Sequence, residues 1–220
     1  GNLRIGNPEH GADLTLDELR EIYDVVVLAT GLSADRTLGM PGEELEGVHR
    51  AGTLTRHWND HPDEAGSVPD LGQRVVIVGN GNVAIDILRI LAKEPHEFHG
   101  SDFADHHTDR LAGCGVRSID IVGRSPAAHA KFDPVMIREL GKLAGVKIAV
   151  ADLDAPAEGD DKRLAALGEI DGHGADDAPR TVTFRFGWAP ERATGSDGRV
   201  RAAHFHKVGG GGELVLPCDS

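Results

Sequence analysis

The sequence of 220 residues predicts an α/β fold, in which a doubly wound parallel sheet carries helices on both faces and a small antiparallel β-meander follows it. Two observations carry this prediction. From Arg74 onward, short apolar runs alternate with helical patterns, which is the order expected of a parallel sheet. After Arg180, alternating segments separated by glycine-rich turns replace that order, and such segments are typical of antiparallel strands.

The part of the chain before Arg74 predicts two elements and a long loop. Thr15, with Glu18 three residues later, matches a capping box and predicts a short helix that runs to about Glu21. Residues 24–29 form a continuous apolar run, which is typical of a buried strand. Residues 34–71 are interrupted by proline and glycine pairs, so we expect a loop there.

From Arg74 onward, three apolar runs and the helical segments among them predict the parallel sheet and its helices. In chain order, the expected elements are a strand at 74–78, a helix from Asn82 to about Lys93, a helix capped by Ser101 or Asp102 that ends near Ala112, a strand at 118–122, a helix at 134–143, a strand at 146–150 and a weak helix near 162–167. We expect the first helix to bury Val83, Ile87, Ile90 and Leu91. The meander is expected from strands at 181–186, 199–208 and 213–216.

Composition excludes several classes of function. The chain has 36 acidic and 23 basic residues and a formal net charge of −13, which argues against nucleic acid or an anionic membrane as a partner. No apolar run approaches the roughly 18 residues of a spanning helix, and no signal peptide opens the sequence. Cys114 and Cys218 form no CxxC pair, so we expect no disulfide framework and a cytoplasmic location. The 12 histidines lack cysteine or carboxylate neighbours in a zinc-site pattern, so no metal is expected.

A glycine-rich loop is the most specific signal in the sequence. Residues 79–84 read Gly-Asn-Gly-Asn-Val-Ala, a G-x-G-x-x-A pattern that follows a predicted strand and opens a predicted helix. In a Rossmann-like fold, Gly79 permits the tight turn, Gly81 leaves room for a pyrophosphate, and Ala84 lets helix and strand pack closely. The helix N-terminus then attracts the phosphates. The alternative is an ordinary tight turn between strand and helix. Asn82 as the helix N-cap is compatible with either interpretation, because a cap residue can also face the ligand.

The end of the next strand indicates which dinucleotide would bind. An acid at this position favours NAD, whereas an arginine accommodates the 2′-phosphate of NADP. Here residues 122–125 read Val-Gly-Arg-Ser, so Arg124 favours NADP, unless it is a solvated arginine at a strand end. About 40 residues separate the glycines from Arg124 instead of the usual 20 or so, and the helix predicted at 101–112 fills the difference.

Three segments together resemble the adrenodoxin-reductase-type ferredoxin–NADP reductases. Residues 79–86 with Arg89-Ile90-Leu91 resemble that family's pyridine-nucleotide motif. Residues 122–124, Phe132 and Arg138-Glu139-Leu140 are similar to its second signature. Residues 24–31, followed by Pro41-Gly42-Glu43, resemble its junction between the FAD and NADP parts. The resemblance covers residues 3–150 well and the remainder loosely.

The resemblance implies that residues 1–220 are an NADP-binding domain inserted into a FAD domain, with residues 1–23 and 213–220 as the junctions to FAD-domain pieces outside this sequence. It implies an enzyme in which NADPH passes a hydride to FAD, and the flavin passes single electrons to an iron–sulfur ferredoxin. Protein groups then supply position and electrostatics, because the cofactors carry the chemistry. Two alternatives stay open: a freestanding dinucleotide-binding or sensing module without catalysis, and the reductase part of a glutamate-synthase-like protein.

The resemblance also assigns site residues. The pyrophosphate would be held by Gly79, Asn80, Gly81, Asn82 and Val83. Arg124 would hold the 2′-phosphate, and Glu139 would lie near the nicotinamide, unless it is a surface acid in the last turn of a helix. The sequence departs from the family at Ser125, where relatives carry a second arginine, and at Pro126-Ala127, where they carry Gly-Pro. The Ser125 hydroxyl or Lys131 would have to replace part of the missing phosphate contact.

Overall fold

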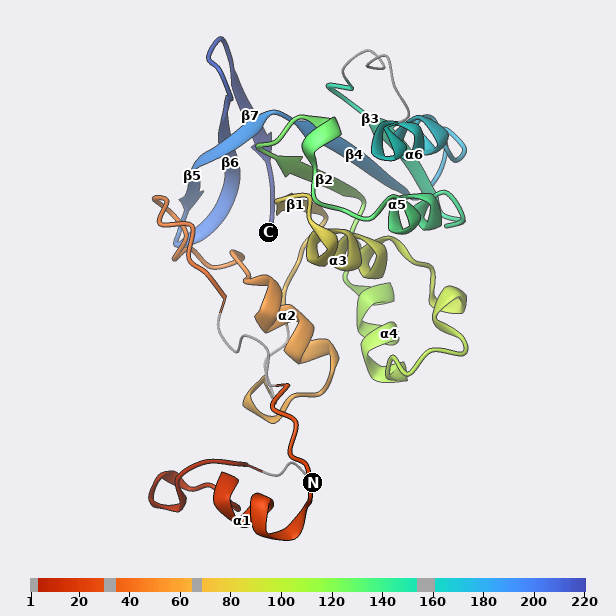
Figure 1. The fold of residues 1–220 in the computed structure, drawn as a ribbon. Helices are drawn as coiled ribbons and strands as arrows, with labels where there is room; N and C mark the ends of the chain where they lie inside the picture. Colours follow the sequence, from red (N-terminus) through yellow and green to blue (C-terminus); the bar gives the residue numbers. More distant parts are fainter. Residues whose placement is uncertain (1–3, 30–34, 65–68, 154–160) are drawn as a thin grey trace.

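Figure 1 shows the computed structural model of the chain, which describes residues 4–29, 35–64, 69–153 and 161–220. Four strands form a parallel sheet in the order β1-β2-β4-β3, and three form an antiparallel sheet in the order β5-β6-β7. The strands are β1 (Arg74–Val78), β2 (Ser118–Gly123), β3 (Val146–Val150), β4 (Arg180–Phe186), β5 (Trp188–Ser196), β6 (Arg199–Lys207) and β7 (Glu213–Pro217). The α-helices are α1 (Leu16–Ile22), α2 (Ala51–Trp58), α3 (Asn82–Ala92), α4 (Asp105–Gly113), α5 (Pro134–Leu140) and α6 (Lys162–Ile170). The predicted α/β class is therefore confirmed.

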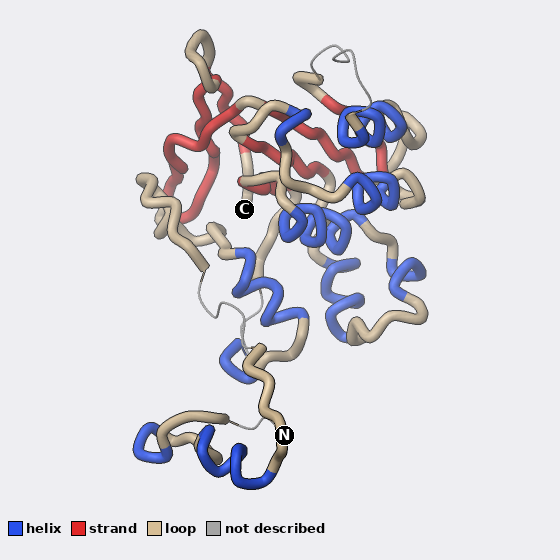
Figure 2. The backbone as a smooth tube through the Cα atoms, viewed as in Figure 1, coloured by secondary structure: helices blue, strands red, loops and turns tan. Residues whose placement is uncertain are grey.

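The arrangement of the layers differs from the prediction in one respect. One face of the parallel sheet packs on helices, and its buried side chains include Ile77, Ile121 and Phe184. The opposite face contributes Val122 to a separate core that it shares with the antiparallel sheet, including Phe205 of β6. The described helices that share the sheet's main core thus lie on one side, and the antiparallel sheet covers part of the other (Figure 2). Within the confirmed fold class, the described residues thus differ in one detail from the expected helices on both faces, because the antiparallel sheet packs against the second face.

Strand β4 was expected in the meander but lies in the parallel sheet, between β2 and β3. Its alternating pattern has a physical cause, because Val182 and Phe184 face the helices while Arg185 lies on the other side. There the Arg185 Nε donates to the Asp120 carboxylate of β2 at 2.7 Å. The ion pair on one face therefore gives this parallel strand the alternation of apolar and polar residues that is typical of antiparallel strands. The meander's first strand is instead β5, which the sequence analysis missed.

Several element boundaries also differ. Residues 24–29 form no strand among the described residues, and Val25, Val27 and Leu28 are 66–79% exposed. Residues 51–58, expected as loop, form α2, which buries Leu54 and Trp58. The N-cap of α4 is Ala104 instead of Ser101 or Asp102, and the helix begins at Asp105. Helix α5 ends at Leu140 instead of 143, and α6 continues to Ile170.

The helix that follows the glycine-rich loop buries most of the expected face, and Val83 is the exception. In α3, Val83 is 57% exposed, while Ile85 and Leu88 are fully buried together with the expected Ile87 and Leu91. The predicted capping box is confirmed in α1, where the Thr15 side chain accepts from the Glu18 N–H and the Glu18 carboxylate accepts in return.

The last residues of the chain extend the parallel sheet at the edge of β1. Val76 donates its N–H to the Ser220 carbonyl at 2.9 Å, and Ser220 donates its own to Arg74 at 3.3 Å, which is the parallel pattern. Asp219 fixes this segment, because its carboxylate accepts from the N–H groups of Gln73 and Arg74. In the described part of the chain, no helix has both the length and the apolar character needed to cross a membrane.

Candidate dinucleotide-binding site

The glycine-rich loop joins β1 to α3 at the carboxyl end of the parallel sheet. Gly79 has a φ of +112°, which is unfavourable for a side-chain-bearing residue, and its N–H donates to the Val122 carbonyl of β2 at 2.8 Å. Gly81 is the N-cap of α3, with φ −93° and ψ 178°. The turn therefore presents the first N–H groups of α3 at the end of β1 and β2.

The space beside both loop glycines is open. A methyl group built on Gly79 or on Gly81 meets no heavy atom of the described residues within 4 Å. The absence of side chains is therefore not required by packing within this part of the chain, apart from the positive φ at Gly79. Open space above a helix N-terminus is the geometry that a pyrophosphate needs to reach backbone N–H groups.

Asn80 is buried between the two glycines. It is 8% exposed, and its Nδ2 has no hydrogen-bond partner among the described residues. The side chain lies against the α-carbon of Gly123, where a methyl group would meet the Asn80 amide at 2.0–2.4 Å. A buried amide donor without a partner is costly, so it fits a site that a ligand oxygen completes.

Asn82 does not cap α3, because Gly81 takes that position. Its Oδ1 instead accepts the N–H of Asp133 at 2.8 Å, and the Asp133 carboxylate caps α5 by accepting from the N–H of Val135. The first turns of α3 and α5 thus lie side by side, which Figure 1 also shows. Asn82 therefore holds the loop against the segment that carries the second sequence signature.

Arg124 follows β2 next to the loop. Its side chain is exposed, and within the described residues its guanidinium makes no hydrogen bond or ion pair. Ser125 is half-buried, and its carbonyl accepts from the N–H of Gly187 at 3.2 Å, so the position is fixed by the β4–β5 junction. The fold thus brings Arg124 and Ser125 to the same edge of the sheet as the glycine-rich loop.

Glu139 occupies a different environment. It lies in the last turn of α5, and its Oε2 accepts from Arg89 of α3 at 2.6 Å, while Arg89 also pairs with Asp86. Arg89 is seven residues beyond Asn82, or about 10 Å along α3 at 1.5 Å per residue. The structure therefore places Glu139 along the flank of α3 and not beside the phosphate loop.

The structure adds two features that the sequence analysis did not identify. Gly123 is required by the close approach of Asn80, which becomes visible only once β1 and β2 are paired. Arg163 of α6 reaches the loop after β2 and donates to the Ala128 carbonyl at 3.5 Å. Nothing in the spacing of the sequence connects Arg163 with Arg124, so no sequence signal could have found it.

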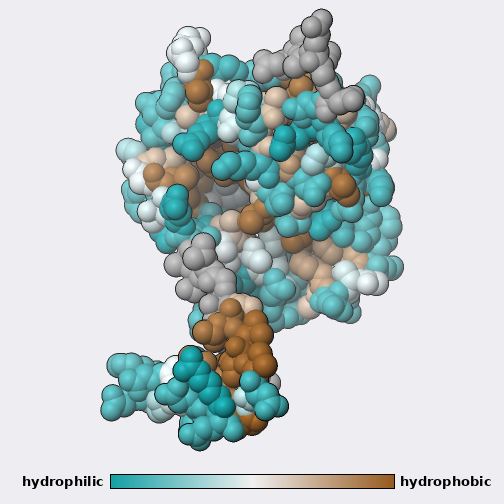
Figure 3. Space-filling model, viewed as in Figure 1, coloured by the Kyte–Doolittle hydropathy of each residue, from teal (hydrophilic) through white to brown (hydrophobic). Residues whose placement is uncertain are grey.

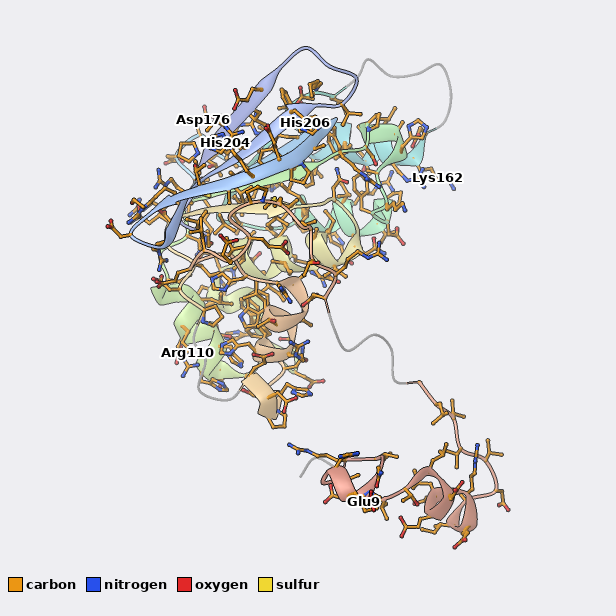
Figure 4. All side chains as sticks on the ribbon, turned by 90° about the vertical axis from the view of Figure 1, so that its left-hand side faces the viewer. Glu9, Arg110, Lys162, Asp176, His204 and His206 are labelled. Carbon is orange, nitrogen blue, oxygen red and sulfur yellow. The ribbon has the colours of Figure 1, made fainter. Side chains whose placement is uncertain are left out.

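Three of the histidines contact polar side chains that lie far from them in the sequence or on a neighbouring strand. His106 and His107 both contact the Asp60 carboxylate, a neighbour that the sequence pattern does not reveal. His204 and His206 lie on β6 (Figure 4), where His204 contacts Arg192 and Thr194 of β5. His204 thus belongs to a polar network on the antiparallel sheet.

Comparisons with known proteins agree with this geometry. The family model described as pyridine nucleotide-disulphide oxidoreductase matches residues 9–150. Cindoxin reductase of Citrobacter braakii is 43% identical over 203 residues, which cover 89% of this chain and 43% of the relative. A mitochondrial NADPH:adrenodoxin oxidoreductase of Arabidopsis thaliana is 38% identical over 152 residues, or 68% of this chain and 32% of the relative. These names confirm the predicted resemblance.

A solved structure extends the similarity to the fold. The NADPH-ferredoxin reductase FprA of Mycobacterium tuberculosis, in complex with NADPH, superposes with a TM-score of 0.81 and 30% identity over 94% of this chain and 50% of that one. The chain thus spans about half the length, or less, of the proteins it matches.

Proposed function

Since this chain belongs to the pyridine nucleotide-disulphide oxidoreductase family, we propose that it is the NADP(H)-binding part of a flavin-dependent ferredoxin–NADP reductase. In that enzyme the nicotinamide supplies a hydride to FAD, and an iron–sulfur ferredoxin receives the electrons. One observation carries the proposal: an open glycine-rich loop, a buried Asn80 amide without a partner and an exposed Arg124 meet at one edge of the sheet.

Each part of this edge has a separate role in the proposal. The backbone from Gly79 to Val83 binds the pyrophosphate through the first N–H groups of α3. The Asn80 Nδ2 donates to a ligand oxygen, which removes the cost of its unpaired burial. Arg124 binds the 2′-phosphate, and Ser125 or Lys131 supplies the weaker contact in place of a second arginine. NADP(H) is therefore preferred over NAD(H).

The exposed segment before residue 30 supports the proposed junction with a FAD domain. Ile22, Tyr23, Val25, Val27 and Leu28 are each at least 60% exposed, and brown atoms gather where this segment leaves the main body in Figure 3. Apolar side chains in a row rarely stay in water unless another surface covers them. We propose that FAD-domain pieces cover residues 22–28 and adjoin residues 1–23 and 213–220. In the full-length protein, the amides of residues 24–29 should then exchange slowly with deuterium.

The two cysteines support a proposal about the cellular location. Cys114 and Cys218 are both free in the structure, and free thiols persist in a reducing compartment. We propose the cytoplasm.

The experiment that tests the proposal is a titration of the chain with NADPH and with NADH. Wild type should bind NADPH more tightly, and Arg124→Ala should weaken NADPH binding by about 1.5–3 kcal/mol, the value of a charged hydrogen bond, while NADH binding stays nearly unchanged. Arg117→Ala is the matched control, because Arg117 is exposed at the opposite end of β2. Equal affinities of wild type for the two nucleotides would contradict the NADP assignment.

A further inference from the structure

We propose that Asp60, His106 and His107 form a binding site for a divalent transition-metal ion of the zinc type, which ties α4 to the turn after α2. The Nε2 atoms of His106 and His107 lie 3.1 and 3.0 Å from the same Asp60 oxygen, Oδ1. One ligand atom from each residue lies within 4.8 Å of the others. The proposal concerns a different part of the chain from the candidate dinucleotide site and does not depend on it.

The convergence of the two histidines is specific. Neighbouring residues of a helix point in different directions, so the side chains of His106 and His107 would not ordinarily meet. Here their rings lie 4.0 Å apart, and both Nε2 atoms are directed at Asp60, 46 and 47 residues earlier in the sequence. Asp60 itself has a φ of +52°, a conformation that only a few per cent of non-glycine residues adopt.

The distances fit metal coordination. Zinc binds imidazole nitrogen and carboxylate oxygen at about 2.0–2.1 Å, so two ligands of a tetrahedral ion lie about 3.3 Å apart. The separations of 3.0 and 3.1 Å between each Nε2 and the Asp60 Oδ1 are close to this value, and one ligand atom from each residue lies within 4.8 Å of the others. Two imidazoles and one carboxylate favour zinc, nickel or copper over magnesium or calcium, which prefer oxygen.

The surroundings hold one ligand rigidly and leave room for water. His107 is 2% exposed, and its ring packs against His57 at 4.9 Å and Phe103 at 5.8 Å between centroids. Asp60 and His106 are more than half exposed, and a surface cavity of about 360 Å³ opens beside Asp60. Three protein ligands and a solvent-accessible fourth position are the arrangement of an open zinc site.

The charge of the site suits a cation. Histidine binds a metal as the neutral imidazole, so the Asp60 carboxylate is the one charged group among the three ligands. The whole chain also carries a formal net charge of −13. Arg110, one turn later on α4 and labelled in Figure 4, is one positive group that opposes binding, and Arg89 and Lys93 line the cavity beside Asp60. Because Arg110 is exposed, water screens that repulsion.

The test uses the chain without an affinity tag, loaded with ZnCl₂ and passed through a metal-free column. Wild type should retain one zinc per chain, and its Tm should rise with ZnCl₂ and fall back with EDTA. His106→Gln and Asp60→Asn should lose both effects, whereas His99→Gln, which changes an exposed histidine outside the cluster, should keep them. Asparagine also tolerates positive φ, so Asp60→Asn should leave the turn intact.

A second measurement identifies the ligand directly. When Co²⁺ replaces zinc, His106→Cys should add a sulfur-to-cobalt charge-transfer band, and His99→Cys should not. The proposal is overturned if wild type retains no zinc, or if His106→Gln and Asp60→Asn retain as much as wild type does. Absence of the charge-transfer band in a His106→Cys protein that is folded would also overturn it.

Discussion

The side-chain amide of Asn80 lies directly against the α-carbon of Gly123, so the glycine-rich loop and the end of β2 fit together only when residue 123 lacks a side chain. This contact ties the two parts of the candidate site to each other. Asn80 belongs to the loop that would hold the pyrophosphate, and Gly123 precedes Arg124. This close contact, together with the hydrogen bond from the Gly79 N–H to the Val122 carbonyl, fixes the loop beside the strand end that carries Arg124.

The contact makes a prediction about stability. Gly123→Ala would force the new methyl group against the Asn80 amide, and such overpacking typically costs about 1–3 kcal/mol. Asn80→Ala removes the obstructing atoms, so the double variant should be less destabilised than the sum of the single variants. Denaturant unfolding of the four proteins measures this coupling. Strict additivity would show that the two residues do not contact each other.

A second prediction concerns pH and the C-terminal segment. The Arg74 guanidinium, at 2.7 Å, and the N–H groups of Gln73 and Arg74 lower the pKa of Asp219 from 3.8 to about 2. Because the folded pKa is depressed, this stabilisation is complete above pH 3.8 and is lost as the pH falls toward 2. Its size at neutral pH is about 2 kcal/mol.

Asp219→Asn should therefore lower the free energy of unfolding by about 2 kcal/mol near neutral pH, and the difference from wild type should shrink as the pH falls below 4. Asp176→Asn is the control, because that side chain is 95% exposed and makes one ion pair, to Lys147. Its effect should stay within about 0.5 kcal/mol. A difference between wild type and Asp219→Asn that does not change with pH would contradict the assignment.

The sequence predicts best where local patterns decide the structure. The G-x-G-x-x-A loop, the strand before it and the helix after it follow from residues within about 20 positions, and the structure has all three. The prediction of a strand at residues 24–29 is wrong because it depends on more than the local pattern. An apolar run indicates that a segment will be buried, but not which part of a protein will bury it.

Long-range pairing accounts for the other differences. The position of β4 between β2 and β3 depends on strand order, and the Arg185–Asp120 ion pair that alters its pattern joins residues 65 positions apart. The contacts of Asp60 with His106 and His107 span 46 and 47 positions. No spacing within one segment encodes such contacts, so they require the three-dimensional structure.

The pairing of Glu139 with Arg89 leads to a third prediction, made for the full-length flavoprotein. If Glu139 acts near the nicotinamide, Glu139→Gln should slow hydride transfer from NADPH about tenfold or more, because a charge close to the reacting atoms is lost, and leave NADPH affinity nearly unchanged. Glu169→Gln is the control, since Glu169 pairs with the neighbouring Arg138 of α5 at 2.7 Å. Equal rates in both variants would assign Glu139 a structural role in holding α5 against α3.

The last prediction separates binding from folding at the phosphate loop. Gly81 has a φ of −93°, which alanine adopts freely, and a methyl group there meets no described atom within 4 Å. Two small effects on stability oppose each other, because alanine restricts the unfolded chain by about 0.4–1 kcal/mol but is a poorer N-cap than glycine. Gly81→Ala should thus shift the free energy of unfolding by less than about 1 kcal/mol.

Nucleotide binding should respond much more strongly, because the methyl group occupies the space where a pyrophosphate approaches the backbone. We expect Gly81→Ala to lose most of its NADP(H) affinity while its Tm stays close to that of wild type. Gly168→Ala provides the control, since Gly168 lies in α6 with equally open surroundings and no place in the site. It should be slightly stabilised and bind NADP(H) as wild type does. If Gly81→Ala binds as tightly as wild type, residues 79–84 are an ordinary turn, and the dinucleotide site must be sought elsewhere in the chain.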